Sequence, residues 1–301
     1  MLTSEKDMIV SFFNKQIQLK SLSCARGHSA PEPIPMAVNF FVKVTDHCNA
    51  RCAFCSNGGS CKDLHKFNHD KLWEVVDELI AKNISINRIN ITGGEPSVAP
   101  HTVNQILDTA DIGKYRNIHL HLNSNGLLPS SQRLMQHPRW DSISMSLHHY
   151  NPDKLSEIYG VDIPESAFMF EDIGVEKLNA SCNLIRGYID NPIEIERMMK
   201  FVVSLGLPRL GFVALMKVNG YCRNRYVDFD EIDFTSIPHL YFTESRNRGL
   251  DCKCSNYLFN HSGRILEIYM RNYSNHNYCE SSLLYDGEYL RQGFHDNNII
   301  Y

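Results

Sequence analysis

The run Thr45-Asp46-His47-Cys48-Asn49-Ala50-Arg51-Cys52-Ala53-Phe54-Cys55 places three cysteines on one short segment, with three and then two residues between them. Three thiolates can hold three irons of a [4Fe–4S] cluster and leave the fourth iron open to bind another molecule. A closed cluster with four cysteine ligands usually only stores or carries electrons. The run therefore predicts an open metal site at which chemistry takes place.

The residues around this run predict repeated strand–helix units. Helices are expected between the strands, most clearly over 70–82 and 192–205. Strands that alternate with helices indicate a parallel sheet, either curled into a full or partial barrel or open. In each case the loops after the strands carry the site, and the cysteine run directly follows the first strand. The strand candidates are 38–44, 86–92, 117–123, 141–147, 175–185 and 209–216.

The chain divides into three parts, and the fold class is α/β. Residues 1–35 are expected to form an N-terminal helix, over 5–20, and a proline-rich connector. Residues 36–216 hold the six strand–helix units. The alternation stops after residue 216, so we interpret 217–301 as a small C-terminal subdomain.

The composition excludes some classes of protein. The chain has 301 residues, of which 43% are hydrophobic, and a net charge of −4. This is enough apolar sequence for a full core, and the near-neutral charge does not predict a nucleic acid or an anionic membrane as partner. No apolar stretch is long enough to span a bilayer and no signal sequence is evident, so we expect a cytoplasmic protein.

The chain contains ten cysteines. Disulfides are unusual in a reducing compartment, so clustered cysteines there indicate metal binding or catalysis. Cys24, Cys61 and Cys182 stand apart, and each is interpreted as a small buried hydrophobic residue.

Further motifs follow the later strands. They are Thr92-Gly93-Gly94-Glu95-Pro96, Asn123-Ser124-Asn125-Gly126, Ser144-Met145-Ser146-Leu147 and the run from Leu178 to Gly187. Together with the cysteine spacing and Phe54 before the last cysteine, they resemble radical S-adenosylmethionine (SAM) enzymes over roughly residues 36–220. This resemblance implies a partial (β/α)6 TIM-like barrel.

The resemblance also implies cofactors and a reaction. Cys48, Cys52 and Cys55 would bind the catalytic [4Fe–4S] cluster, whose open iron chelates SAM. Reductive cleavage of SAM yields a 5′-deoxyadenosyl radical that abstracts hydrogen from a substrate, with a flavodoxin or ferredoxin as electron donor. The residues expected to contact the cofactor are Gly93, Gly94, Glu95, Pro96, Asn123, Ser124, Ser144, Ser146, Asn179, Ser181 and Asn183.

Physical reasons support several of these contacts. Gly93 and Gly94 have no side chain, so their backbone can closely approach the methionine amino group. Glu95 adds a carboxylate that can accept hydrogen bonds from that ammonium. Asn179, Ser181 and Asn183 alternate, so they share one face of their strand and are candidates for the methionine carboxylate or the ribose. For the asparagines and serines, a purely structural role is an open alternative.

A second group of cysteines comprises Cys222, Cys252, Cys254 and Cys279. It resembles the twitch-type auxiliary-cluster subdomain found in part of the family. Four thiolates would close a second cluster, whereas three would leave an open iron, as in the molybdenum-cofactor cyclase relatives. The Cys-x-Cys spacing is tighter than the usual two-residue gap. A zinc site or unconnected thiols are the alternatives.

The substrate is less well defined. Interleaved Tyr, Arg, Asn and His over 269–278 favour a small metabolite or nucleotide. Modification of a ribosomally made peptide is the alternative. A non-catalytic iron–sulfur or zinc regulator, with His47 or Cys61 completing a zinc site, is a third hypothesis. A regulator needs no methionine-binding loop, so Gly93-Gly94-Glu95-Pro96 argues against it.

Overall fold

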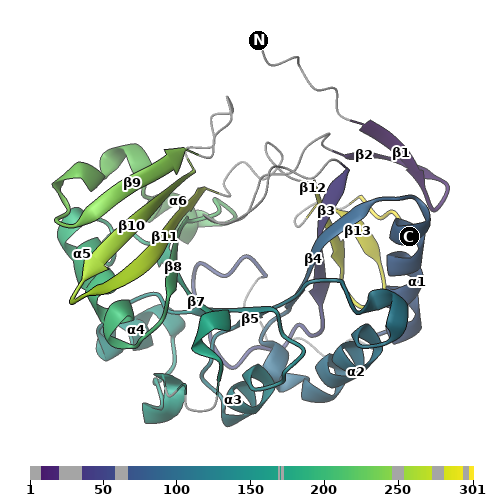
Figure 1. Cartoon of the computed structure of the whole chain (residues 1–301), viewed down its shortest axis with the longest axis horizontal. Helices are drawn as coiled ribbons and strands as arrows, with labels where there is room; N and C mark the ends of the chain where they lie inside the picture. Colours follow the sequence, from purple (N-terminus) through teal and green to yellow (C-terminus); the bar gives the residue numbers. More distant parts are fainter. Residues whose placement is uncertain are drawn as a thin grey trace.

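The computed structural model describes residues 8–19, 36–57, 67–168, 170, 173–245, 254–272, 281–293 and 298–301. The strands in these ranges form a two-stranded sheet and an 11-stranded sheet of order β13-β12-β3-β4-β5-β6-β7-β8-β11-β10-β9. The large sheet curves around an open centre, and its two ends do not pair with each other (Figure 1). No helix in the described ranges is long and apolar enough to cross a membrane.

Six parallel strands make the central part of the large sheet. They are β3 (Ala37–Lys43), β4 (Ser85–Thr92), β5 (Leu120–Ser124), β6 (Ser142–Ser146), β7 (Leu178–Leu184) and β8 (Arg209–Ala214). The helices that connect them are α1 (His69–Ala81), α2 (Pro100–Ala110), α3 (Pro129–Met135), α4 (Pro152–Tyr159) and α5 (Pro192–Ser204). The helices cover the outer face of the curved sheet (Figure 1). These observations confirm the predicted six-unit α/β partial barrel.

Short elements lie in the connections. They are α6 (Gly220–Asn224) and the 3₁₀ turns η1 (Pro96–Val98), η2 (Gly113–Tyr115), η3 (Glu165–Phe168), η4 (Val175–Lys177), η5 (Phe229–Glu231) and η6 (Phe234–Ser236).

The two faces of the sheet differ sharply in polarity. In β7 the residues Leu178, Ala180 and Cys182 are buried, and the alternating residues between them are partly exposed. The same alternation occurs in β6 and β8. The buried set packs with the apolar faces of the helices in one core. The opposite, inner face carries polar residues, which include Asn179, Ser181 and Asn183 on β7, as predicted.

The strands after residue 216 extend both edges of the same sheet. Strands β9 (Leu240–Ser245), β10 (Ser255–His261) and β11 (Arg264–Asn272) form an antiparallel meander, and β11 pairs in parallel with β8. Strands β12 (Ser281–Tyr285) and β13 (Leu290–Gln292) lie at the other edge, where β12 pairs in parallel with β3. The hydrogen-bonded sheet therefore continues across the predicted boundary at residue 216.

The helix predicted over 5–20 is wrong for the part of it that the structure describes. Residues 8–19 form a hairpin of β1 (Met8–Phe12) and β2 (Lys15–Leu19), turned at Phe13 and Asn14, whose φ angles are 44° and 61°. The apolar residues that suggested a helical face do not all face the core, since Ile9 is 71% exposed. Tertiary packing of Phe12, Ile17 and Leu19 decides the conformation instead.

Candidate functional site

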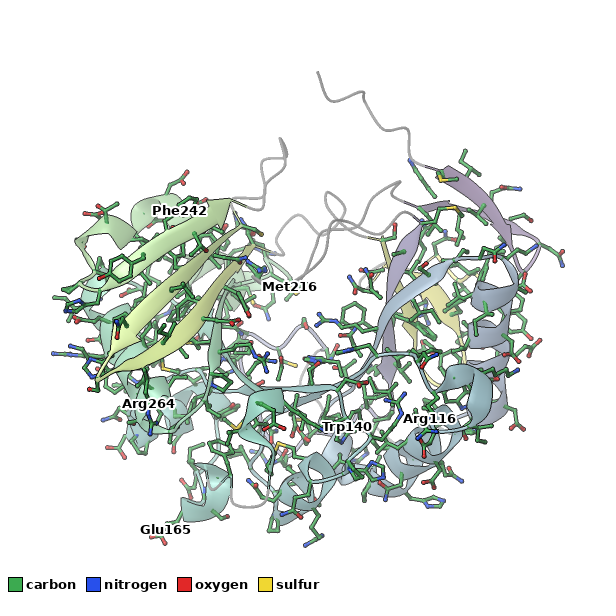
Figure 2. All side chains as sticks on the ribbon, in the orientation of Figure 1. Arg116, Trp140, Glu165, Met216, Phe242 and Arg264 are labelled. Carbon is green, nitrogen blue, oxygen red and sulfur yellow. The ribbon has the colours of Figure 1, made fainter. Side chains whose placement is uncertain are left out.

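The cysteine run leaves β3 and lines a pocket at the carboxyl ends of the central strands. Met216, just beyond β8, borders this pocket and the central opening (Figure 2). The structure brings most of the predicted site residues together here. The predicted residues that line the pocket are Cys48, Cys52, Cys55, Gly93, Gly94, Glu95, Asn123, Ser124, Ser146 and Asn183.

Gly93 and Gly94 make direct contact with the cysteine run. The Gly94 N–H donates to the Thr45 carbonyl at 2.7 Å, and the Glu95 N–H donates to the His47 carbonyl at 2.7 Å. A Cβ on Gly94 would overlap the His47 carbonyl group, and one on Gly93 would lie 2.6 Å from the Thr45 oxygen. The glycines therefore let two loop backbones join, which is a different reason for glycine from the predicted approach to a methionine amino group.

Glu95 is a buried carboxylate that accepts three hydrogen bonds. It is 1% exposed. Its Oε1 accepts from the Ser97 N–H at 3.0 Å and from the Ser124 hydroxyl at 2.8 Å, and its Oε2 accepts from the Asn125 N–H at 2.8 Å. Burial raises the pKa of Glu95, and these hydrogen bonds partly offset that rise. The carboxylate joins the loop after β4 to the loop after β5; its predicted contact with the methionine ammonium stays a prediction.

The loop after β5 also reaches the first cysteine. The Asn125 amide donates to Asn49 Oδ1 at 2.8 Å, and its Nδ2 lies 3.9 Å from Cys48 Sγ. Cys48 Sγ additionally accepts from the Ala50 N–H at 3.4 Å. Hydrogen bonds of this kind fix the orientation of a ligand and influence the properties of a cluster.

The far side of the cysteine run is held by helices. The Arg51 N–H donates to the Tyr159 carbonyl at 2.7 Å, and the Tyr159 hydroxyl donates to the Ser146 carbonyl at 2.6 Å. Asn219 donates through Nδ2 to the Ala53 carbonyl at 3.0 Å. The run is thus fixed at several points by the protein itself, which preorganises the three thiols.

The three cysteines are partly exposed, and burial raises the pKa of two of them. The pKa of the Cys48 thiol is raised, and that of Cys52 is raised to about 12, chiefly by burial and then by the neighbouring thiols. A nearby positive charge would stabilise the thiolate form of these partly buried cysteines, and bound iron would supply that charge.

The cysteine run supplies three thiols as metal ligands. Within the described ranges, no three His, Cys, Asp or Glu side chains converge as the ligands of one metal ion. A zinc ion requires such convergence, with about four ligands at about 2.3 Å for sulfur. The cysteines of a cluster bind different irons. Three thiols on one segment match the three cysteine-bound irons of an open [4Fe–4S] cluster.

Some predicted residues do not line the pocket. They are Pro96, buried in η1, and Ser144, Asn179 and Ser181, which lie further along the inner face of β6 and β7. Asn179 donates to the Ile143 carbonyl at 3.3 Å, and its buried Oδ1 has no hydrogen-bond partner among the residues that the structure describes. Contacts of these residues with a cofactor stay predictions.

The structure describes two of the four cysteines predicted to bind a second cluster. Cys222, in α6, is buried in an apolar cluster with Ile158, Ile185 and Leu215, and its thiol donates to the Phe54 carbonyl at 3.5 Å. Cys254 is buried beside the end of β11, where its sulfur accepts from the Asn272 N–H at 3.3 Å. Cys252 and Cys279 lie outside the described residues.

The sequence did not single out His148 or Tyr159, although both line the pocket. His148 is 4% exposed, and burial lowers its pKa to about 3, so the ring is neutral. The position of His148 just after a parallel strand could have indicated it, because polar residues there tend to face the site. Asn125, which was interpreted as a turn residue with its role open, also lies here.

Comparison with known proteins decides the family. The model of the Radical SAM superfamily matches residues 42–208, which is more than half of the chain. The chain belongs to the radical SAM superfamily. This confirms the predicted family and the pair of cofactors that defines it, a [4Fe–4S] cluster and SAM.

Curated relatives differ in the names of their reactions. A GTP 3′,8-cyclase from Alkaliphilus oremlandii is 26% identical, over 64% of this chain and 61% of its own length. A PqqA peptide cyclase from Ruegeria pomeroyi is 25% identical, over 66% of this chain and 53% of its own. The chain spans less than two thirds of the length of these relatives.

Solved structures show a more distant similarity. Streptococcus suis SuiB bound to S-adenosylmethionine is 16% identical, with a TM-score of 0.49, over 64% of this chain and 44% of that one. At this level the similarity carries no inference about function.

Gly94→Ala should separate the cysteine run from the loop after β4, because the added Cβ would overlap the His47 backbone. We expect a loss of about 3 kcal/mol in the free energy of unfolding and little bound iron after reconstitution. Denaturant unfolding and iron analysis measure both effects. Gly113→Ala, where a Cβ meets nothing within 4 Å, is the control and should behave as wild type. Normal iron binding by Gly94→Ala would contradict this account of the loop.

Glu95→Gln should destabilise the protein by about 1–3 kcal/mol, because the amide NH₂ would face a buried backbone or hydroxyl donor. Denaturant unfolding measures the change. Glu196→Gln, at a surface pair with Lys200, is the matched control and should cost less than about 1 kcal/mol. Equal, small effects of the two substitutions would show that Glu95 does not hold the loops together.

Proposed function

We propose that this chain is a radical SAM enzyme whose cluster, bound by Cys48, Cys52 and Cys55, reductively cleaves S-adenosylmethionine. The observation that carries the proposal is the direct junction of the cysteine run with the glycine-rich loop. In support, the N–H groups of Gly94 and Glu95 donate to the carbonyls of Thr45 and His47, so the glycine-rich loop and the cysteine run meet at one pocket.

The residues of the chain prepare this pocket for the reaction. When bound, the cluster supplies the electron that cleaves the sulfonium of SAM, which gives the 5′-deoxyadenosyl radical that abstracts hydrogen. Glu95 keeps the loops after β4 and β5 in place. Ser146 and Asn183, on neighbouring strands, present polar groups from the inner face toward the same pocket. The helices and the apolar core close the outer face against water.

We favour a small polar metabolite or nucleotide as substrate. The inner face of the sheet supports this choice, because β6 and β7 direct Ser144, Ser146, Asn179, Ser181 and Asn183 toward the central opening, where a structural barrel would usually hold Val or Ile. The similarity to GTP 3′,8-cyclases agrees with it. The similarity to a PqqA peptide cyclase favours the second candidate, modification of a ribosomally made peptide.

A second iron–sulfur cluster is part of the proposal. Cys222 and Cys254 would be ligands together with Cys252 and Cys279. In support, Cys254 lies beside Asn272, which pairs with Ala214 at the end of β8, and Cys222 packs against the next residue, Leu215. A flavodoxin or ferredoxin is the proposed electron donor.

Cys52→Ala should abolish the formation of 5′-deoxyadenosine from SAM by the anaerobically reconstituted and reduced protein, because it removes one ligand of the catalytic cluster. Chromatography of the products measures this. We expect about eight irons per wild-type chain with two clusters and about four with one. Cys182→Ala, at a buried thiol in the core, should retain activity. Continued cleavage of SAM by Cys52→Ala would show that the catalytic site is assigned to the wrong residues. Zinc without iron in the wild-type protein would favour a regulator.

A further inference from the structure

His148 is packed against the cysteine run. It lies just beyond β6, is buried, and lines the same pocket as Cys48 and Cys52. Its ring meets the ring of Phe54 edge to face, with a centroid distance of 4.9 Å and an interplanar angle of 84°. Because Phe54 lies between Cys52 and Cys55, the imidazole contacts the segment that carries the thiols.

The hydrogen bond of the ring fixes its tautomer. The backbone N–H of Asn183 donates to His148 Nδ1 at 3.1 Å. A ring nitrogen that accepts a hydrogen bond carries no proton, so the proton of the imidazole is on Nε2. No hydrogen bond of Nε2 is found within the described part of the chain. The ring therefore carries one N–H donor, and His148 lines the pocket.

We propose that His148 Nε2–H donates a hydrogen bond to a sulfur of the cluster held by Cys48, Cys52 and Cys55, and thereby raises the cluster's reduction potential. Reduction adds negative charge to the cluster, so a hydrogen-bond donor stabilises the reduced form more than the oxidised form. His148 is thus a residue that tunes electron transfer to SAM. This inference rests on the proposed function only in requiring that the cysteine run holds a [4Fe–4S] cluster.

The neighbouring residue provides a matched control. His149 is also buried, and its Nδ1 also accepts a backbone hydrogen bond, from the Asn151 N–H at 2.9 Å. Its ring packs near Tyr150 and Tyr188, and it is not among the residues that line the pocket. A purely structural role as acceptor would be shared by both histidines, whereas donation to a cluster is open to His148 alone.

The test is a redox titration of the reconstituted cluster without SAM, monitored by electron paramagnetic resonance, in four variants. His148→Leu removes both the donor and the acceptor. His148→Asn keeps an acceptor near the position of Nδ1 but no donor near that of Nε2. His148→Gln carries an amide NH₂ near the position of Nε2. His149→Leu is the control.

We expect the equilibrium constant for one-electron reduction to fall about tenfold in His148→Leu and His148→Asn, which corresponds to a potential lower by about 59 mV. His148→Gln and His149→Leu should keep the wild-type potential. If His148→Leu does not retain a cluster, the Asn and Gln variants decide the question between them.

Three results would overturn the inference. One is an unchanged potential in His148→Asn. Another is an equal shift in the Asn and Gln variants, since loss of the imidazole ring, and not loss of the Nε2 donor, would then be responsible. The third is a shift in the potential that occurs only after SAM is added, because His148 would then donate to SAM and not to the cluster. A wild-type protein that binds no cluster would contradict both the proposed function and this inference. A cluster whose potential does not change on substitution of His148 would contradict the inference alone.

Discussion

The buried carboxylate of Glu95 joins the segments on which the site depends. Its oxygens accept from Ser97, Ser124 and Asn125, and its own N–H donates to His47 in the cysteine run. A charge at this depth is costly unless hydrogen bonds compensate for it. The loops that follow β3, β4 and β5 are therefore held in one arrangement, and this arrangement positions the three thiols.

The division of the sheet into two faces explains how a packed fold can hold a polar reaction site. The outer face buries apolar side chains under the helices, and the inner face keeps Asn and Ser side chains around an open centre. Strands β11 and β12 extend the sheet on either side without closing it (Figure 1).

The sequence predicted the six parallel strands, the shared inner face of Asn179, Ser181 and Asn183, and the loops that meet at the pocket, because alternation and turn signals are local. It could not predict the hairpin at 8–19, whose helical spacing loses to packing in the tertiary structure. It did not predict the contact of Gly94 with the His47 backbone, and it overlooked His148. Both features depend on contacts between loops that are distant in sequence. A local sequence pattern does not predict such contacts.

The central claim is that the cysteine run holds a cluster with one open iron that binds the methionine part of SAM. Electron–nuclear double resonance of the reduced cluster, with SAM labelled with ¹⁵N at its amino group, tests this most directly. The account predicts a hyperfine coupling to the labelled nitrogen. A reduced cluster that binds SAM with no coupling to that nitrogen would contradict it.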